Sequence, residues 1–358
     1  MRRIIALSFT IIIGLLLPGC QKAEPKESPP TASEGIFVDN PFEAGDNVSS
    51  DVIGALGHGP DNPVLREDGT RAPYEYHGGQ FELNYHVKGS GTAKNVGFLL
   101  FLNGIPQPYQ IDGTGDMRYM NMFELEEDDQ QYLFSFVFTP VTGTAGDTLE
   151  LKIYSVLYPQ FQPDMVTTSS YGIYYSILEG TIEINFQADP DVEGAEAAIL
   201  PALSSVTVRS DDMTSDFVSL HLNDSFTAGG QPAKDQLADR VFSFIDYNGG
   251  PAVDNIDVSN QDLLHITYQM VGVPGAVYRI SLFGNNQPMT DGEALSWEIT
   301  LSQGKVAVIE ADVDISSLDN FTTFYMLACP VNRGSASDSV VLLGHMDGPV
   351  LLYKGGSK

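Results

Sequence analysis

The sequence predicts an all-β fold, because apolar residues recur at every second position in most of its apolar segments. The clearest alternation is FELNYHV at 81–87, and similar segments lie at 148–154, 182–186, 206–209 and 297–301. Aromatic and β-branched residues fill these segments, and Gly, Asn, Asp and Pro separate them at short intervals. A period of two places one face of each strand in a core, so the pattern indicates antiparallel β-sandwiches of an immunoglobulin-like or jelly-roll-like kind.

The strongest local signal is a hairpin whose first strand is the apolar run Phe98–Leu102 and whose second begins at Ile105. Asn103 and Gly104 separate the two strands. Both residue types tolerate positive φ, which a two-residue type I′ turn requires. Two prolines follow at once and lack an N–H, so the returning segment is expected at a sheet edge or in a loop.

An internal repeat indicates that the chain holds two related, duplicated domains in tandem. In the best match, LFLNGIPQPY aligns without gaps on ISLFGNNQPM, which places Gln107 on Gln287. Four such matches occur in the same order along the two halves of the chain. The number of residues between paired segments varies, as expected if loops differ in length between the two copies. The paired segments are 81–87 with 264–270, 100–109 with 280–289, 151–159 with 322–330, and 176–184 with 344–352.

These matches set the expected domain boundaries. The first β-sandwich is expected over 36–187 and the second over 202–354, joined by an acidic, turn-rich linker at 188–201. Residues 20–35 are rich in Pro, Lys, Glu and Ser and have almost no apolar content. Such a segment cannot bury a core, so it is predicted to be a disordered tether.

The first 19 residues have the organisation of a secretory signal: Arg2 and Arg3 precede an apolar run that ends at Leu17. The run is shorter than the roughly 18–20 apolar residues that span a bilayer core. It ends in Leu17-Pro18-Gly19-Cys20, which resembles the lipobox of bacterial lipoproteins, although Pro18 departs from that pattern. The resemblance covers only residues 1–20. It implies cleavage before Cys20, diacylglycerol on that cysteine, palmitate-type acylation, and an extracytoplasmic protein held to a bacterial membrane, at the cell surface or on the periplasmic face.

The charge of the chain excludes some partners. Its formal net charge is −29, from 47 acidic and 18 basic residues, and it becomes −31 once the two arginines of the signal are removed. A surface this acidic repels phosphate backbones and anionic headgroups. We therefore expect no nucleic-acid partner and no membrane contact beyond the lipid. Cys329 lies in an apolar stretch and is expected to be a buried thiol.

The sequence contains no recognisable catalytic motif, and no catalytic residue is assigned. Walker, Gly-x-Ser-x-Gly, His-Glu-x-x-His and Cys-x-x-Cys patterns are absent, and the six histidines are scattered. The candidate ligand-binding residues are Gln107, Tyr109 and Gln287, because a proline-containing loop with an amide in both copies suits the rim of a ligand site. The alternative is ordinary turn chemistry that closes the hairpin, and it is favoured.

Calcium is the one cofactor that the sequence suggests, at two acidic segments. Asp112 and Asp116 flank Gly-Thr-Gly, which resembles a fragment of a calcium loop without its bidentate glutamate. Asp189, Asp191 and Glu193 in the linker form the second candidate. A plain turn explains each segment as well, and that interpretation is favoured.

Together these features predict a lipid-anchored surface protein that acts as a non-enzymatic binding or display module for a glycan, a cell-wall polymer or another protein. Two alternatives stay open. One is a glycan hydrolase with an unrecognised carboxylate pair, which an acidic chain could supply. The other is a passive structural subunit of a surface assembly.

Overall fold

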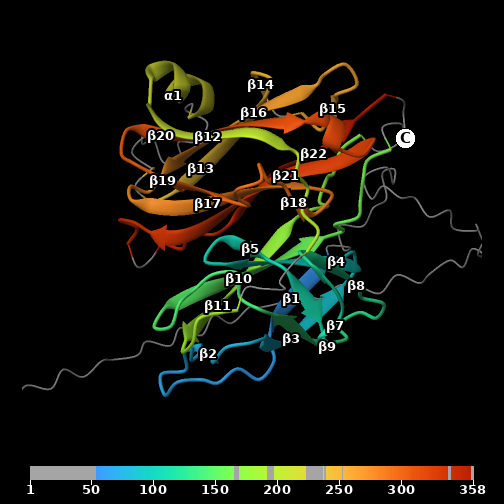
Figure 1. Cartoon of the computed structure of the whole chain (residues 1–358), viewed down its shortest axis with the longest axis vertical. Coiled ribbons are helices and arrows are strands. Elements are labelled where there is room, and N and C mark those ends of the chain that lie inside the picture. The colour runs from blue at the N-terminus through green and yellow to red at the C-terminus, as the bar shows by residue number, and fades with distance from the viewer. Residues whose placement is uncertain are drawn as a thin grey trace, which may run out of the picture. The chain divides into compact units, whose positions relative to one another are not determined.

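Four β-sheets make up nearly all of the regular structure in the computed structural model (Figure 1). The structure describes residues 54–164, 169–191, 197–222, 237, 239–251, 253–337 and 340–355. All of them belong to one compact unit, Asp46–Lys358. The sheets form two sandwiches of mainly antiparallel strands, which confirms the predicted all-β, two-sandwich fold class.

The first sandwich uses the strands from β1 to β11. One sheet has the order β1-β3-β9-β6-β7, and the other β2-β11-β10-β4-β5, with β8 paired to β4. The strands are β1 Ala55–Pro60, β2 Tyr74–Tyr76, β3 Phe81–Ser90, β4 Asn95–Leu102, β5 Ile105–Gln107, β6 Tyr109–Ile111, β7 Thr114–Arg118, β8 Met120–Glu124, β9 Tyr132–Phe138, β10 Thr148–Leu157 and β11 Ile177–Phe186.

The second sandwich uses the strands from β12 to β22. Its sheets have the orders β12-β20-β16-β13-β14 and β15-β22-β21-β17-β18, with β19 paired to β17. The elements are β12 Leu203–Asp212, α1 Ser215–His221, β13 Val241–Tyr247, β14 Gly250–Pro251, β15 Asn255–Asp257, β16 Leu263–Gly272, β17 Ala276–Gly284, β18 Gln287–Pro288, β19 Trp297–Thr300, β20 Lys305–Asp314, the 3₁₀ turn η3 Ile315–Ser317, β21 Phe321–Arg333 and β22 His345–Tyr353.

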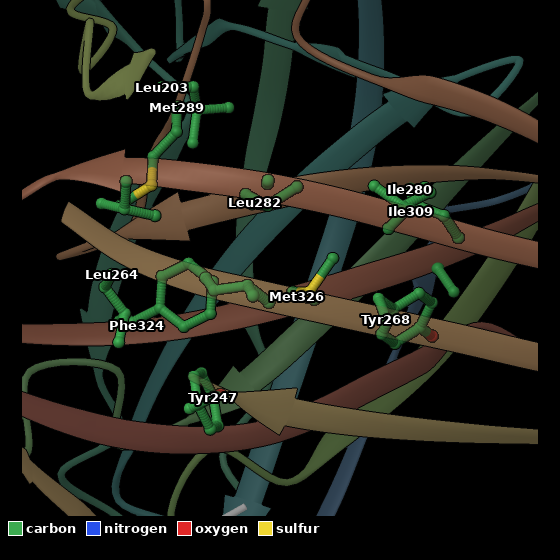
Figure 2. Packing of buried hydrophobic residues seen from close by; sticks show 14 of the residues in the cluster. Leu203, Tyr247, Leu264, Tyr268, Ile280, Leu282, Met289, Ile309, Phe324 and Met326 are labelled. Atoms are coloured by element: carbon green, nitrogen blue, oxygen red, sulfur yellow. The ribbon is translucent and has the colours of Figure 1, made fainter. Parts of the chain in front are cut away.

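Each sandwich has its own core, formed by the inward face of each strand. In β3, Leu83, Tyr85 and Val87 are buried while Glu82 and Asn84 are exposed, as the period of two predicts. In the second sandwich, side chains from both sheets meet between the layers, as Figure 2 shows for Tyr268 and Met326 among others. No helix in the described part of the chain is long and apolar enough to cross a membrane.

The strand orders confirm the internal duplication. The sheet β2-β11-β10-β4-β5 with β8 has the same connectivity as β15-β22-β21-β17-β18 with β19. In both sheets the first strand in this order pairs parallel with its neighbour. A parallel pair at the same place in two mainly antiparallel sheets supports their common origin. The copies differ beside β9 and β20: the hairpin strand β6 pairs with β9, whereas the leading strand β12 pairs with β20. This replacement explains why the start of one copy has no counterpart in the other.

The gapless alignment of the two hairpins is wrong by two residues. Asn103 and Gly104 form the first turn, with φ of 49° and 75°, as predicted for a type I′ turn. In the second copy the turn is Asn285-Asn286, because Gly284 pairs with Gln287. The two glutamines therefore do not occupy equivalent positions. An even shift keeps every side chain on the same face of the sheet, so the alternating pattern could not reveal the error.

Candidate functional site at the junction of the sandwiches

The two sandwiches are joined face to face by the sheets that contain β4, β10, β17 and β21. These strands bury both of their faces, one in a sandwich core and one at the junction. Their sequences are therefore apolar at nearly every position, as in NVGFLLFL of β4, instead of alternating. Figure 1 shows the four sheets as successive layers, with the two sheets that contain these strands in the middle.

Aromatic rings fill the centre of the junction. Phe283 of β17 stacks on Tyr325 of β21 with ring centroids 5.1 Å apart, and it meets the edge of Phe101 of β4 at 6.1 Å. Phe101 in turn contacts Tyr154 of β10 at 5.5 Å. All four side chains are fully buried. The Phe101–Phe283 pair crosses from one sandwich to the other, and such a pair contributes roughly 0.5–1.5 kcal/mol beyond the burial of its area.

Hydrogen bonds fix one end of the junction through the segment that follows β10. Asn286 donates from Nδ2 to the carbonyl oxygen of Pro159 at 2.8 Å, and its Oδ1 accepts from the hydroxyl of Tyr325 at 3.0 Å. The Tyr171 hydroxyl donates to Oγ1 of Thr323 at 2.9 Å. Burial raises the pKa of Tyr325 well above its usual range, so this hydroxyl remains a donor.

A buried ion pair fixes the other end. Nζ of Lys152 lies 2.7 Å from Oε1 of Glu179 and 3.3 Å from the more exposed Glu150. The second carboxylate oxygen of Glu179 accepts from the backbone N–H of Gly344, in the other sandwich, at 2.7 Å. Burial acts to lower the pKa of Lys152, but the charge and hydrogen bond of Glu179 outweigh it, so the pKa is raised and the amine stays protonated.

Cys329 lies beside this ion pair and is fully buried, as expected from its apolar stretch. The hydroxyl of Tyr154 contacts its Sγ at 3.6 Å across the junction. Burial raises the pKa of the thiol to about 12. Since the thiolate is the nucleophilic form, Cys329 is an unreactive packing residue.

Clefts lined by residues of both sandwiches lie beside the junction. The first, which we call the Gln287 groove, has a volume of about 700 Å³ and is walled by both sandwiches. Exposed Asp116, Arg118 and Gln287 supply its polar groups, and Met122, which is 54% exposed, supplies apolar surface. Its other lining residues are Met117, Tyr119, Met120, Ala197, Ala198, Asn285 and Asn286.

The second cleft, the Lys152 cleft, has a volume of about 340 Å³ and is lined by Glu150, Lys152 and Glu179 together with apolar residues 340–343. It contains two carboxylates, but Lys152 bridges them, and both oxygens of Glu179 already accept hydrogen bonds. The polar groups at the floor of this cleft are therefore used to hold the sandwiches together.

The structure separates the predicted ligand residues. Gln107 is fully buried, and its amide donates to the carbonyl oxygens of Pro108 and Thr139 and accepts from the N–H of Val141, at 2.8–3.0 Å. Tyr109 is fully buried too, with its hydroxyl 2.7 Å from the carbonyl oxygen of Phe98. The Gln107 amide thus binds the segment after β9, and the Tyr109 hydroxyl binds β4. Only Gln287 faces a cleft.

The predicted calcium residues are also dispersed. Asp112 accepts from the N–H of Ser135 through Oδ1 at 2.7 Å, and Asp189 accepts from the N–H of Ala145 at 2.8 Å. Asp116 lies 3.8 Å from Arg118. Among the described residues, which include Asp191, no group of three or more His, Cys, Asp or Glu side chains is arranged to hold a metal ion. Glu193 and the predicted lipidation site Cys20 lie outside the described residues.

Sequence reasoning missed the junction, and with it Lys152, Glu179 and the aromatic layer. Two signals were available. Strands such as β4 and β21 are apolar on both faces, which indicates burial on both sides. A single lysine within the apolar run LKIYSVL also implies a buried partner for its charge.

Comparison with known proteins gives only distant structural likeness. The fibronectin(III)-like modules of Clostridium thermocellum CbhA are 9% identical, with 83% of this chain and 93% of that chain covered and a TM-score of 0.18. The Salmonella enterica SafA pilin in complex with the SafB chaperone is 8% identical, with 83% and 95% covered and a TM-score of 0.21. The C-terminal domain of the Streptococcus agalactiae polypeptide BspA is 7% identical, with 84% and 100% covered and a TM-score of 0.19.

No protein-family model and no curated protein matches the sequence. TM-scores near 0.2 are too low to carry an argument about function.

Proposed function

We propose that this protein is a lipid-anchored, extracytoplasmic binding module that acts without catalysis and takes its ligand in the Gln287 groove. The observation that carries the proposal is the groove itself, a cleft of about 700 Å³ to which both sandwiches contribute. Clefts of 300–1,000 Å³ at domain interfaces are where ligand sites concentrate. The buried aromatic layer packs between the two sandwiches that supply the walls of the groove.

The chemistry of the groove suits a ligand with both apolar and hydrogen-bonding groups, such as a glycan, a cell-wall polymer or a protein segment. Methionine side chains adapt to irregular apolar surfaces. Gln287, Asp116 and Arg118 offer an amide, a carboxylate and a guanidinium at the surface. The lipobox-like sequence ending at Cys20 is the basis for the proposed anchor and location.

The experiment is a retention assay with protein comprising residues 35–358, incubated with purified glycans and cell-wall polymers with and without calcium. Retained protein and released product are measured in the same samples. Retention without product supports the proposal. A requirement for calcium would indicate that the acidic segments take part in binding. Product release would contradict it and direct mutagenesis to Glu150 and Glu179, the two carboxylates of the Lys152 cleft.

Variants locate the site. Replacing Arg118 and Gln287 together by alanine removes two polar groups of the groove, and we expect retention to fall at least about tenfold. Leu133→Ala is the matched control, because Leu133 is 63% exposed on β9 and does not line the groove. If the double variant binds as well as the control, the ligand site is not in the Gln287 groove.

A further inference from the structure

The outer edge of β12 is a second surface that the proposed function does not use. β12 pairs with β20 from Ser205 to Asp212 in one unbroken register. On its other side it pairs with no strand in the described part of the chain. Within the described residues the edge is occupied at its start, where the N–H of Leu203 donates to the carbonyl oxygen of Thr290 at 3.1 Å.

The hydrogen-bond pattern shows which residues face this edge. Met213 donates its N–H to the carbonyl oxygen of Gly304 in the register that β12 follows after its register shift. From Ser205 onward, odd-numbered residues therefore point their backbone groups towards β20. Pairing alternates along an antiparallel strand. The N–H and C=O groups of Val206, Val208 and Ser210 therefore point away from the sheet, where a further strand can pair with them.

The first sandwich shows that this position accepts a strand. There β6 occupies the place of β12, and β7 pairs antiparallel on its outer side. β7 also packs Met117 against the core. The second sandwich has no described counterpart of β7. Val208 lies on the same face of β12 as Val206, which packs against the core, and it is 42% exposed.

We propose that a second copy of this chain fills the position, with the β12 strands of the two copies pairing antiparallel about a two-fold axis at Val208. This register places Val208 against Val208 of the other copy, Val206 against Ser210, Thr207 against Arg209, and Ser205 against Asp211. Every outward-facing backbone group from 206 to 210 then finds a partner. The two exposed valines cover each other.

Self-complementarity argues for a second copy. Centring the axis one residue later would set Arg209 opposite its own equivalent, which is unfavourable because like charges opposite each other destabilise a strand pair. In the register centred on Val208 no like charges are opposed. The edge also lacks the proline, the lysine and the mid-strand bulge that commonly prevent edge pairing, since its one register shift lies between Leu203 and Ser205.

A single strand pair buries less surface than a standard interface, and the net charge of −31 without the signal opposes association. The dimer is therefore expected to be weak and to strengthen with added salt, which screens charges beyond about 10 Å at 0.1 M. Two chains on one membrane would have a high effective concentration, which suits a weak contact.

The test is disulfide trapping in a chain of residues 21–358, which omits Cys20 and carries Val208→Cys. Directly opposed residues of a hydrogen-bonded antiparallel pair have Cα atoms about 5.5 Å apart, within disulfide range. Buried Cys329 does not compete. We expect Val208→Cys to form a disulfide dimer under mild oxidation at least tenfold faster than the matched control Ser210→Cys, whose equivalents lie far apart across the axis.

A second variant separates pairing from folding. Val208→Pro removes only an N–H that points away from β20, so the sandwich should keep its thermal midpoint while association in sedimentation velocity falls at least tenfold. Equal trapping of the two cysteine variants, no trapping of Val208→Cys, or unchanged association of Val208→Pro would each overturn the proposal.

Discussion

The ion pair of the Lys152 cleft gives the sharpest prediction about stability. Glu179→Ala leaves the ammonium of Lys152, with 8% of its side chain exposed, without its 2.7 Å partner, and it removes the acceptor for the N–H of Gly344. Breaking a buried pair from one side typically costs 3–5 kcal/mol. Glu150 remains 3.3 Å away and is half exposed, so we expect a loss at the low end, about 3 kcal/mol.

The double variant Lys152→Met, Glu179→Leu is the control, because it removes both charges and replaces them with apolar volume. It should be more stable than Glu179→Ala, and a double-mutant cycle should give a coupling of at least about 2 kcal/mol. Urea unfolding followed by circular dichroism and by the fluorescence of Trp297, the single tryptophan, measures both values. A loss below about 1 kcal/mol for Glu179→Ala would refute the reasoning.

Two further predictions concern His58 of the first sandwich and Phe283 of the junction. Nδ1 of His58 lies 2.7 Å from the hydroxyl of Tyr85 and Nε2 lies 3.1 Å from the carbonyl oxygen of Leu178, and burial lowers the pKa of this histidine from 6.5 to about 4. Because this pKa is depressed, its contribution to stability is present above pH 6.5 and is lost as the pH falls towards 4. The loss is up to about 3 kcal/mol. His58→Gln should therefore flatten this part of the profile of unfolding free energy against pH. An unchanged slope would show that other groups cause the acid loss. Phe283→Ala should lower the free energy of unfolding in urea by about 3–5 kcal/mol, because it opens a cavity between the sandwiches. Met122 is exposed, so Met122→Ala should lower it by less than about 0.5 kcal/mol. Similar losses for the two variants would contradict a packed junction.

The sequence by itself determined the fold class, because each strand carries its own record of burial. Leu83, Tyr85 and Val87 alternate with polar residues since one face of β3 meets a core and the other meets water. The turn at Asn103-Gly104 could also be predicted from local sequence, since it depends on two residues that tolerate positive φ. The duplication was detectable because both copies repeat these local signals in the same order.

Only the tertiary structure decided the hairpin register, the junction and the groove. A two-residue shift preserves alternation, so only the pairing of Gly284 with Gln287 shows that Gln107 has another counterpart. Lys152 and Glu179 are 27 residues apart and meet because β10 and β11 are neighbours, while Gly344 reaches them from the other sandwich. Such contacts depend on how sheets stack, and the pattern within a strand records that a face is buried without recording what buries it.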